Sequence, residues 1–153
     1  MNYILENYNQ LKELEDGKKR FSEHICEITP YFKSINPLVV DLRPNYGSWR
    51  MSKTREVENH IGTVHAIAMC NLCEITAGLT IEVTIPPHKR WIPMGMQVQY
   101  LAKAKTDLVA ECFISENVDW ETIDKLSIEV SVKDNHYKEV MKAVIDMKVG
   151  DKR

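Results

Sequence analysis

The stretch NHIGTVHAIAMCNLCEITAGL, residues 59–79, restricts the possible folds more than any other part of the chain. From His65 to Gly78 it is rich in Ala, Met, Leu and Cys, and polar and apolar residues do not alternate. With histidine counted as neutral, Glu74 is its one charged residue. An apolar segment without alternation predicts a helix that is buried on nearly every side. The rest of the chain must therefore supply the elements that surround it.

The two ends of this helix are not equally well defined by the sequence. Gly62 and Thr63 supply a loop and an N-cap before it, and Gly78 could end it. The run LTIEVTI, residues 79–85, is compatible with a strand or with further helical turns, before two prolines stop either one. The C-terminal boundary of the helix stays open at this point.

Most of the chain after residue 37 has the patterns of β-strands. LVVDLR and GSWRMSK flank the turn PNY and predict a hairpin. Four further segments alternate between apolar and polar residues, as strands with one wet face do. We expect those in the C-terminal half to form an antiparallel meander with hairpin connections. The predicted strands are residues 38–43, 47–53, 94–102, 107–115, 125–133 and 139–149.

The N-terminal residues differ from this β-rich part. Between residues 2 and 28 apolar residues recur at helical spacing, with an interruption at Gly17, which predicts two short amphipathic helices. We treat residues 1–29 as a helical extension of a main body of about residues 30–150, within a single domain of 153 residues. The fold class is α+β: a curved antiparallel sheet wrapped around one long central helix, which is the shape of the hot-dog fold.

The charge balance favours no highly charged partner. There are 20 Lys and Arg against 22 Asp and Glu, with a formal net charge of -2 and no long block of like charge, so we expect no nucleic-acid binding and no membrane anchor. The start MNYILENYNQ lacks the features of a signal peptide, and no uninterrupted apolar run is as long as a membrane span. With four cysteines in apolar or periodic segments, we expect a cytoplasmic protein with reduced thiols.

Four side chains near the helix start could in principle bind zinc: His60, His65, Cys70 and Cys73, with Cys-x-x-Cys spacing. Both cysteines would lie in the middle of the helix, a turn or more from His65. The four side chains could not then converge tetrahedrally unless the helix broke. Buried cysteine is also a common core residue, so we predict no metal site.

Glu74 is the residue of the buried helix that most needs an explanation. At helical spacing it shares a face with Asn71 and Gly78, so a polar stripe runs along an apolar helix. At a rim, the carboxylate would simply be solvated or ion-paired. If it is buried and unpaired, it costs several kcal/mol or has a raised pKa, and chains tolerate this chiefly at functional sites. The pattern alone leaves both interpretations open.

Four residues around the helix have the spacing of a known active site. Asn59, Gly62, His65 and Glu74 resemble the signature N-x-x-G-x-x-H-(x8)-D/E of the hot-dog thioesterases related to the phenylacetyl-CoA type. The longer text VENHIGTVHAIAMCNLCEITAGL, followed by RWIPMGMQVQYLAKAKTDL, resembles more closely the hot-dog family called domain of unknown function 4442, over most of residues 30–149. The N-terminal helices lie outside the signature and have no assigned role.

The resemblance implies an acyl-CoA thioesterase, which hydrolyses a thioester to a free acid and coenzyme A. Glu74 would be the general base or nucleophile, and the backbone N–H of Ala66 the leading oxyanion donor, helped by the helix dipole. Asn59 would orient the carbonyl or the water, and His65 would contact the substrate or fix the loop. Coenzyme A would enter only as part of the substrate, so no cofactor is expected.

Four further residues are predicted to contact the substrate. Gly62 belongs to the signature, and Asn71 lies on the stripe of Glu74. Arg90 and Lys103 belong to basic groups that could contact the phosphates of coenzyme A. The length and type of the acyl group and the identity of the thiol carrier are not encoded in these residues.

Two departures from the thioesterase pattern keep an alternative open. Ala66 stands where those enzymes commonly have Gly, and Pro93 lies near the position where some relatives have a helpful Ser. The alternative is a hot-dog protein that binds acyl thioesters without hydrolysing them. A hydratase of the same fold is a weaker third possibility, because its relatives space the acid and the His differently.

The distance between the signature residues also bears on assembly. Nine helical residues from His65 to Glu74, at about 1.5 Å each, separate them by roughly 13 Å. One subunit cannot easily bring both to one carbonyl. The resemblance implies that two subunits pair, so that the acid of one faces the loop and helix start of the other. We therefore expect a homodimer or a dimer of dimers, with an acyl-CoA thioester as substrate.

Overall fold

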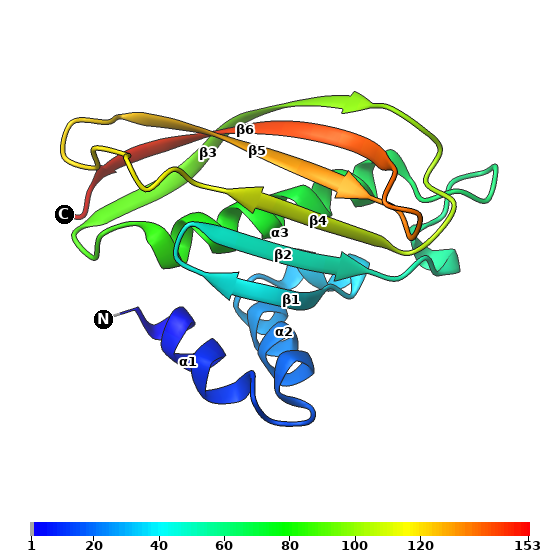
Figure 1. Ribbon diagram of the computed structural model, residues 1–153, viewed down its shortest axis with the longest axis horizontal. Helices are drawn as coiled ribbons and strands as arrows, with labels where there is room; N and C mark the ends of the chain where they lie inside the picture. Colours follow the sequence, from blue (N-terminus) through cyan, green and yellow to red (C-terminus); the bar gives the residue numbers. More distant parts are fainter. Residues whose placement is uncertain (1) are drawn as a thin grey trace.

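A six-stranded antiparallel sheet curved around one long helix forms the main body of the protein (Figure 1). The computed structural model describes residues 2–153. The strand order is β1-β2-β4-β5-β6-β3, so β1 and β3 are the two edges. In chain order the elements are α1 (Tyr3–Leu11), α2 (Gly17–Ile28), η1 (Pro30–Ile35), β1 (Leu38–Arg43), β2 (Tyr46–Met51), η2 (Arg55–Val57), α3 (Ala66–Thr84), β3 (Lys89–Tyr100), β4 (Leu108–Phe113), β5 (Lys125–Lys133) and β6 (Glu139–Asp151).

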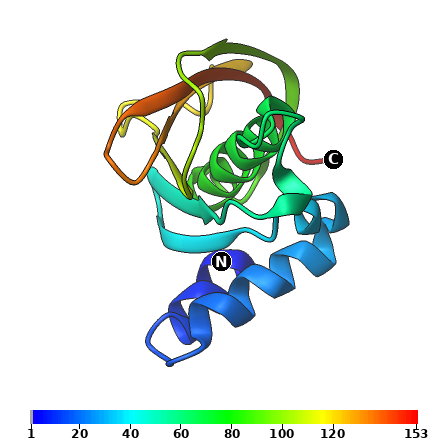
Figure 2. The ribbon, with the colours of Figure 1, turned by 90° about the vertical axis from the view of Figure 1, so that its right-hand side faces the viewer.

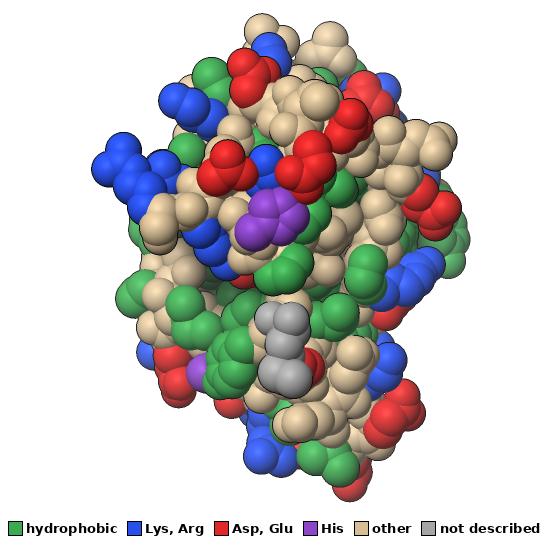
Figure 3. Space-filling model, turned by 90° about the vertical axis from the view of Figure 1, so that its left-hand side faces the viewer, with side chains coloured by type: hydrophobic (Ala, Val, Ile, Leu, Met, Phe, Trp, Pro, Cys, Tyr) green, Lys and Arg blue, Asp and Glu red, His purple; other side chains and the backbone are tan. Residues whose placement is uncertain are grey.

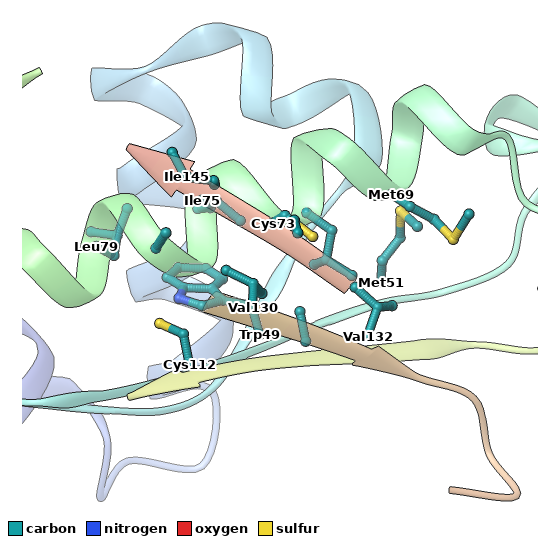
Figure 4. Packing of buried hydrophobic residues seen from close by; sticks show 14 of the residues in the cluster. Trp49, Met51, Met69, Cys73, Ile75, Leu79, Cys112, Val130, Val132 and Ile145 are labelled. Carbon is teal, nitrogen blue, oxygen red and sulfur yellow. The ribbon is translucent and has the colours of Figure 1, made fainter. Parts of the chain in front are cut away.

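The predicted architecture is confirmed. Figure 2 shows the sheet curving around α3, while α1 and α2 lie beside the β1 edge. This is the hot-dog arrangement with a helical extension, and the hairpin of β1 and β2 is present as predicted. Figure 4 shows how side chains of the sheet pack against α3 in the core: Trp49, Met51, Cys112, Val130, Val132 and Ile145 face Met69, Cys73, Ile75 and Leu79.

The helix α3 continues past Gly78 and ends at Thr84, so the run of residues 79–85 is helical and not a strand. Its threonines make this possible. The hydroxyls of Thr76, Thr80 and Thr84 donate to the carbonyl four residues earlier, at 2.7, 2.6 and 2.5 Å. Each buried hydroxyl is thereby satisfied within the helix, and the β-branched residues gain enough from burial to override their weak strand preference.

The expected meander is only partly correct. Strands β4, β5 and β6 are consecutive antiparallel neighbours, but β3 does not pair with β4. It begins at Lys89, earlier than predicted, and pairs with β6 along its length, which places it at the far edge of the sheet. Since β3 and β6 are the two longest strands, pairing them satisfies more backbone groups than a short β3–β4 hairpin could. Pro93 is tolerated because β3 is an edge strand with a bulge at this point.

Among residues 2–153, α3 is the one helix that is long and apolar enough to cross a membrane. We expected no such segment, because no apolar run in the sequence is uninterrupted over the length of a membrane span. The apolar stretch of α3 is 67% buried inside the fold, where the sheet covers it. Burial in the core therefore accounts for its apolar character.

The close approach of β2 to α3 gives a first prediction, because a Cβ added at Gly47 would lie 2.0 Å from Thr80 Oγ1. The Gly47→Ala variant should lower the free energy of unfolding by about 1–3 kcal/mol, as overpacking does. Gly150→Ala is the matched control, since a Cβ there meets nothing within 4 Å. Urea unfolding of both variants measures the difference. Equal stability of the two would contradict the close packing of β2 on α3.

Candidate active site

The carboxylate of Glu74 is half-buried in the middle of α3 and has no partner in its surroundings. Within residues 2–153, its side chain makes neither a hydrogen bond nor an ion pair. Burial raises the pKa of Glu74 above that of an ordinary glutamate. The side chain is therefore partly desolvated and belongs to no structural ion pair, so an ion pair does not account for its position.

Glu74 lines a pocket of about 420 Å³, a volume within the range of small-molecule sites. The pocket lies between the N-terminal extension, α3 and β3. Its walls are mostly apolar, and the apolar side chains that line it include Ile4, Ile25, Ile28, Phe32, Leu79 and Trp91. A free carboxylate thus stands at the edge of an apolar space.

The second carboxylate on this face of α3, Glu82, has a structural role. It lies two helical turns beyond Glu74 and accepts a hydrogen bond from Trp91 Nε1 at 2.6 Å, while its backbone carbonyl accepts one from Asn2 Nδ2 at 2.6 Å. Between the two acids lies Gly78, where an added Cβ would be 3.1 Å from the indole of Trp91. The glycine therefore lets the indole lie against the helix. Of the two acids, only Glu74 is free to act on a ligand.

The start of α3 presents a free donor, as expected for an oxyanion site. His65 is the N-cap, and its Nδ1 accepts a hydrogen bond from the backbone N–H of Ile67 at 3.0 Å. In neutral imidazole this places the ring proton on Nε2. Across residues 2–153, the N–H of Ala66 donates to no other group, as is general for the first N–H of a helix. His65 thus shapes the helix start, and Ala66 offers its N–H.

The loop before the helix is held by Asn59. Its Oδ1 accepts from the backbone N–H groups of Ile61 and Thr63, both at 3.1 Å, and its Nδ2 donates to Thr63 Oγ1 at 2.8 Å. Gly62 adopts φ = 76°, which favours glycine. Asn59 and Gly62 therefore build the loop that leads into the helix start. A direct contact of Asn59 with substrate stays a prediction.

A single chain does not bring the signature residues together. Because α3 is continuous from Ala66 to Glu74, eight residues apart, the oxyanion donor and the acid are about 12 Å apart along the helix. Asn71, on the stripe of Glu74, is used structurally: its Nδ2 donates to Ser34 Oγ at 3.0 Å, which ties α3 to η1.

The two predicted phosphate-binding residues lie at opposite ends of β3. Arg90 is the second residue of the strand and lines a separate pocket of about 570 Å³. Lys103 follows the end of the strand, next to Ala104, whose carbonyl accepts from Val64 N–H at 2.8 Å beside the signature loop. The strand from Arg90 to Tyr100 alone spans about 30 Å, so the two cannot hold the same phosphate within one chain.

Cys70 and Cys73 are not placed as metal ligands. Cys73 is fully buried in the core, where burial raises the pKa of its thiol, and Cys70 is partly buried one turn earlier. In the part of the chain that the structure describes, no three His, Cys, Asp or Glu side chains are grouped so that they could hold a metal ion.

Sequence reasoning missed the pocket walls. Glu82 was not predicted as a site residue, because the sequence left the C-terminal end of α3 open, and Trp91 was not predicted because it lies on β3. Once the helix is extended to Thr84, the spacing of Glu74, Gly78 and Glu82 by four residues places all three on one face. This spacing is the signal that could have identified Glu82.

Solved structures that share this fold are described as thioesterases or contain an acyl-CoA. PA5026 from Pseudomonas aeruginosa, described as a probable thioesterase, is 21% identical and matches over 87% of this chain and 95% of its own, with a TM-score of 0.78. The thioesterase HI1161 from Haemophilus influenzae is 9% identical, over 84% and 87%, with a TM-score of 0.73. The protein smu.793 from Streptococcus mutans, solved bound to acetyl CoA, is 20% identical, over 75% and 89%, with a TM-score of 0.64. The chain therefore has the hot-dog fold that these structures share.

Its family follows from the sequence match. Residues 17–149 match the family described as Domain of unknown function (DUF4442), and the chain belongs to this family, as the resemblance predicted. The structural-genomics protein APC5556 is 40% identical, over 98% of this chain and 99% of its own, with a TM-score of 0.86. No curated protein matches the sequence. The family match includes all of α2, so this helix of the extension belongs to the family's fold.

The two carboxylates of α3 should respond in opposite ways to the same substitution. Since burial raises the pKa of Glu74, its ionised form lowers stability at neutral pH, and this cost disappears as the pH falls below the ordinary carboxyl range. Glu74→Gln should therefore raise the free energy of unfolding at pH 7, by at most about 1 kcal/mol because the group is half-exposed, and change nothing at pH 3.

Glu82→Gln is the matched control for this prediction. It weakens a charge-assisted hydrogen bond to Trp91 and should lower the free energy of unfolding at pH 7 by about 1 kcal/mol. Chemical unfolding of both variants at the two pH values measures these effects. A loss of stability in Glu74→Gln as large as that in Glu82→Gln would show that Glu74 is a structural partner.

Proposed function

We propose that this protein is an acyl-CoA thioesterase, which hydrolyses a thioester to a free acid and coenzyme A with Glu74 as general base or nucleophile. The observation that supports this most is the unpaired carboxylate of Glu74, with its raised pKa, at the edge of an apolar pocket. A base with a raised pKa is better suited to take a proton near neutral pH than an ordinary glutamate. The complex of smu.793 with acetyl CoA supports a coenzyme A ester as the substrate class.

In the general-base form of the reaction, Glu74 takes a proton from water while the water oxygen attacks the carbonyl carbon of the thioester. The carbonyl oxygen becomes an oxyanion, which accepts a hydrogen bond from the N–H of Ala66 at a helix start. Collapse of this intermediate breaks the carbon–sulfur bond, and the proton on Glu74 passes to the leaving sulfur. In the nucleophilic form, Glu74 attacks the carbonyl itself and water then hydrolyses the resulting anhydride.

Two subunits are needed to assemble this site. Because about 12 Å of helix separates Ala66 from Glu74, the acid of one subunit must meet the helix start of another. Exposed apolar side chains support such a contact: Ile61 and Ile67 are 54% and 56% exposed at the loop and helix start, and Ile92 and Met94 are 62% and 59% exposed on β3. The unpaired edge of β3 adds a surface that favours strand pairing. We therefore propose a homodimer, or a dimer of dimers, as the active form.

A hot-dog protein that binds acyl thioesters without hydrolysing them is the second candidate. The observation in its favour is that the polar atoms of Asn59 are engaged within their own loop, so the residue is not free to position water. Ala66 in place of Gly, and the exposed Pro93 on β3, are also compatible with lost catalysis. Both candidates share the pocket and differ only in turnover.

Hydrolysis of a broad series of acyl-CoA esters distinguishes these candidates. The wild-type protein should release free thiol, and Glu74→Gln should reduce kcat by about 10²–10⁴-fold while acyl-CoA affinity is retained. Glu82→Gln, folded and with its carboxamide still facing Trp91, should keep most of the activity. Near wild-type turnover by Glu74→Gln would refute the assignment of the acid. Tight acyl-CoA binding with no hydrolysis by the wild type would favour the binding protein.

Mixing two inactive variants tests the shared site. Asn59→Ala should abolish activity because it disrupts the loop at the helix start of one subunit. Glu74→Gln should abolish activity because it removes the acid that the other subunit contributes. When the two are mixed and allowed to exchange subunits, each heterodimer contains one intact and one doubly altered site, so about a quarter of the wild-type activity should return. Activity no greater than the sum of the two separate variants would mean that each site is built within one subunit.

A further inference from the structure

The N-terminal extension forms one wall of the Glu74 pocket. Ile4 of α1 and Ile25 and Ile28 of α2 line it, together with Phe32 of η1. These residues lie before the signature, and Ile28 is 53% exposed, so part of this apolar wall is open to solvent. An exposed isoleucine beside a free carboxylate is not explained by core packing alone. The wall is therefore a candidate contact for the apolar part of a ligand.

The indole of Trp91 lines the pocket beside Gly78 and Glu82, on the side away from the helix start. It lies against Gly78 and is held by the hydrogen bond of its Nε1 to Glu82. Beyond it lies the second pocket, of about 570 Å³, which shares Trp91, Glu82 and Ile4 with the first. This second space has a mixed lining, in which Lys89 and Arg90 stand beside apolar residues such as Ile85 and Pro86. The indole thus separates a mostly apolar space from one that also contains charged groups.

Figure 3 shows this end of the molecule, where hydrophobic side chains gather between the N-terminal helical part and a surface above it that carries Asp and Glu as well as Lys, Arg and His side chains. Because Ile28 is 53% exposed, the apolar wall of the pocket reaches the molecular surface at the N-terminal extension. A ligand chain that passed the indole would meet charged groups, which disfavour an apolar chain.

We propose that the pocket holds the acyl chain of the thioester, with the N-terminal extension as its outer wall and the indole of Trp91 as the stop that sets the maximum chain length. This proposal rests on the proposed function, because it places the thioester carbonyl at Glu74. The ligand class is an apolar acyl chain of short to medium length.

The length of the acyl chain that fits follows from the spacing of residues along α3. Gly78, where the indole lies, is one turn from Glu74, and Glu82, which holds the indole, is two turns away, or about 6 and 12 Å. An extended chain of single bonds advances about 1.2 Å per bond, as the polypeptide backbone does, so the space fits roughly five to ten carbon atoms.

The charges of the pocket exclude one class of acyl group. Glu74 lies at its near end and Glu82 at its far end, and the one indole donor, Trp91 Nε1, is already used by Glu82. A second carboxylate at the end of the acyl chain would meet like charge and no free indole donor. Esters of dicarboxylic acids should therefore be poor ligands compared with alkanoyl esters of the same length.

A series of straight-chain acyl-CoA esters tests whether the indole of Trp91 limits the length of the bound acyl chain. In the wild type, affinity should rise about fourfold for each methylene up to the limit and then level off or fall. Trp91→Ala should move this limit to longer chains, and Ile28→Trp, which fills the pocket from its exposed rim, should move it to shorter ones. Leu14→Trp is the matched control: it adds an indole to the same extension, away from the residues that line the pocket, and should leave the limit unchanged.

Measuring affinity in the Glu74→Gln background separates this proposal from the proposed function. One outcome is that the maximum chain length shifts with Trp91→Ala and Ile28→Trp but the wild type hydrolyses nothing. This result would support the acyl pocket and refute the thioesterase assignment. If the wild type hydrolyses acyl-CoA and neither variant shifts the maximum chain length, the thioesterase assignment is supported and this pocket is not the acyl site. Should Trp91→Ala fail to fold, Ile28→Trp at the exposed rim still tests whether the acyl chain occupies this pocket.

Discussion

The enclosure of α3 by the curved sheet is the interaction on which the rest of the structure depends. The helix is apolar on almost all of its surface, so the sheet must curve around it, and β2 comes so close that a glycine is required opposite Thr80. The sheet cannot cover the whole circumference of a helix. The stripe of Glu74, Gly78 and Glu82 is left facing the N-terminal extension and β3, and the pocket forms there.

The polar groups of α3 are almost all satisfied, and this is what makes Glu74 informative. The threonine hydroxyls bond back to the helix, Asn71 is tied to η1, and Glu82 holds Trp91. A buried polar group without a partner is costly, so the fold uses structural partners wherever it can. Glu74 is the exception in this helix, and a half-buried free carboxylate next to an apolar pocket is the observation on which the proposed catalytic role rests.

The sequence was sufficient for features that depend on local pattern. Absence of alternation identified α3, and alternation identified the strands, because both periodicities are direct consequences of backbone geometry. The end of α3 was not predictable, since most of residues 79–85 are β-branched, and the helix continues to Thr84 in an environment of burial and threonine back-bonds that the sequence pattern does not show. The pairing of β3 with β6 was missed because strand order depends on contacts between residues distant in the chain.

The residues of the candidate site were likewise predictable only in part. The spacing of the signature placed Glu74 and His65 correctly on the central helix and at its start, while the engagement of Asn59 in its own loop is a matter of side-chain geometry that spacing does not encode. The wall supplied by α1 and α2 was not predictable either. Amphipathic spacing shows that a helix buries one face, but not which surface it covers.

The most direct test of the central claim is the titration of Glu74 itself in the folded protein, followed by NMR of ¹³C-labelled glutamate and assigned by comparison with Glu74→Gln. A free catalytic base in this environment should titrate with a pKa above that of an ordinary glutamate, and thioester hydrolysis should decline as the pH falls through that same pKa, because the ionised form is the active one. A pKa at or below the ordinary value, or a rate that does not follow the titration of Glu74, would contradict the account.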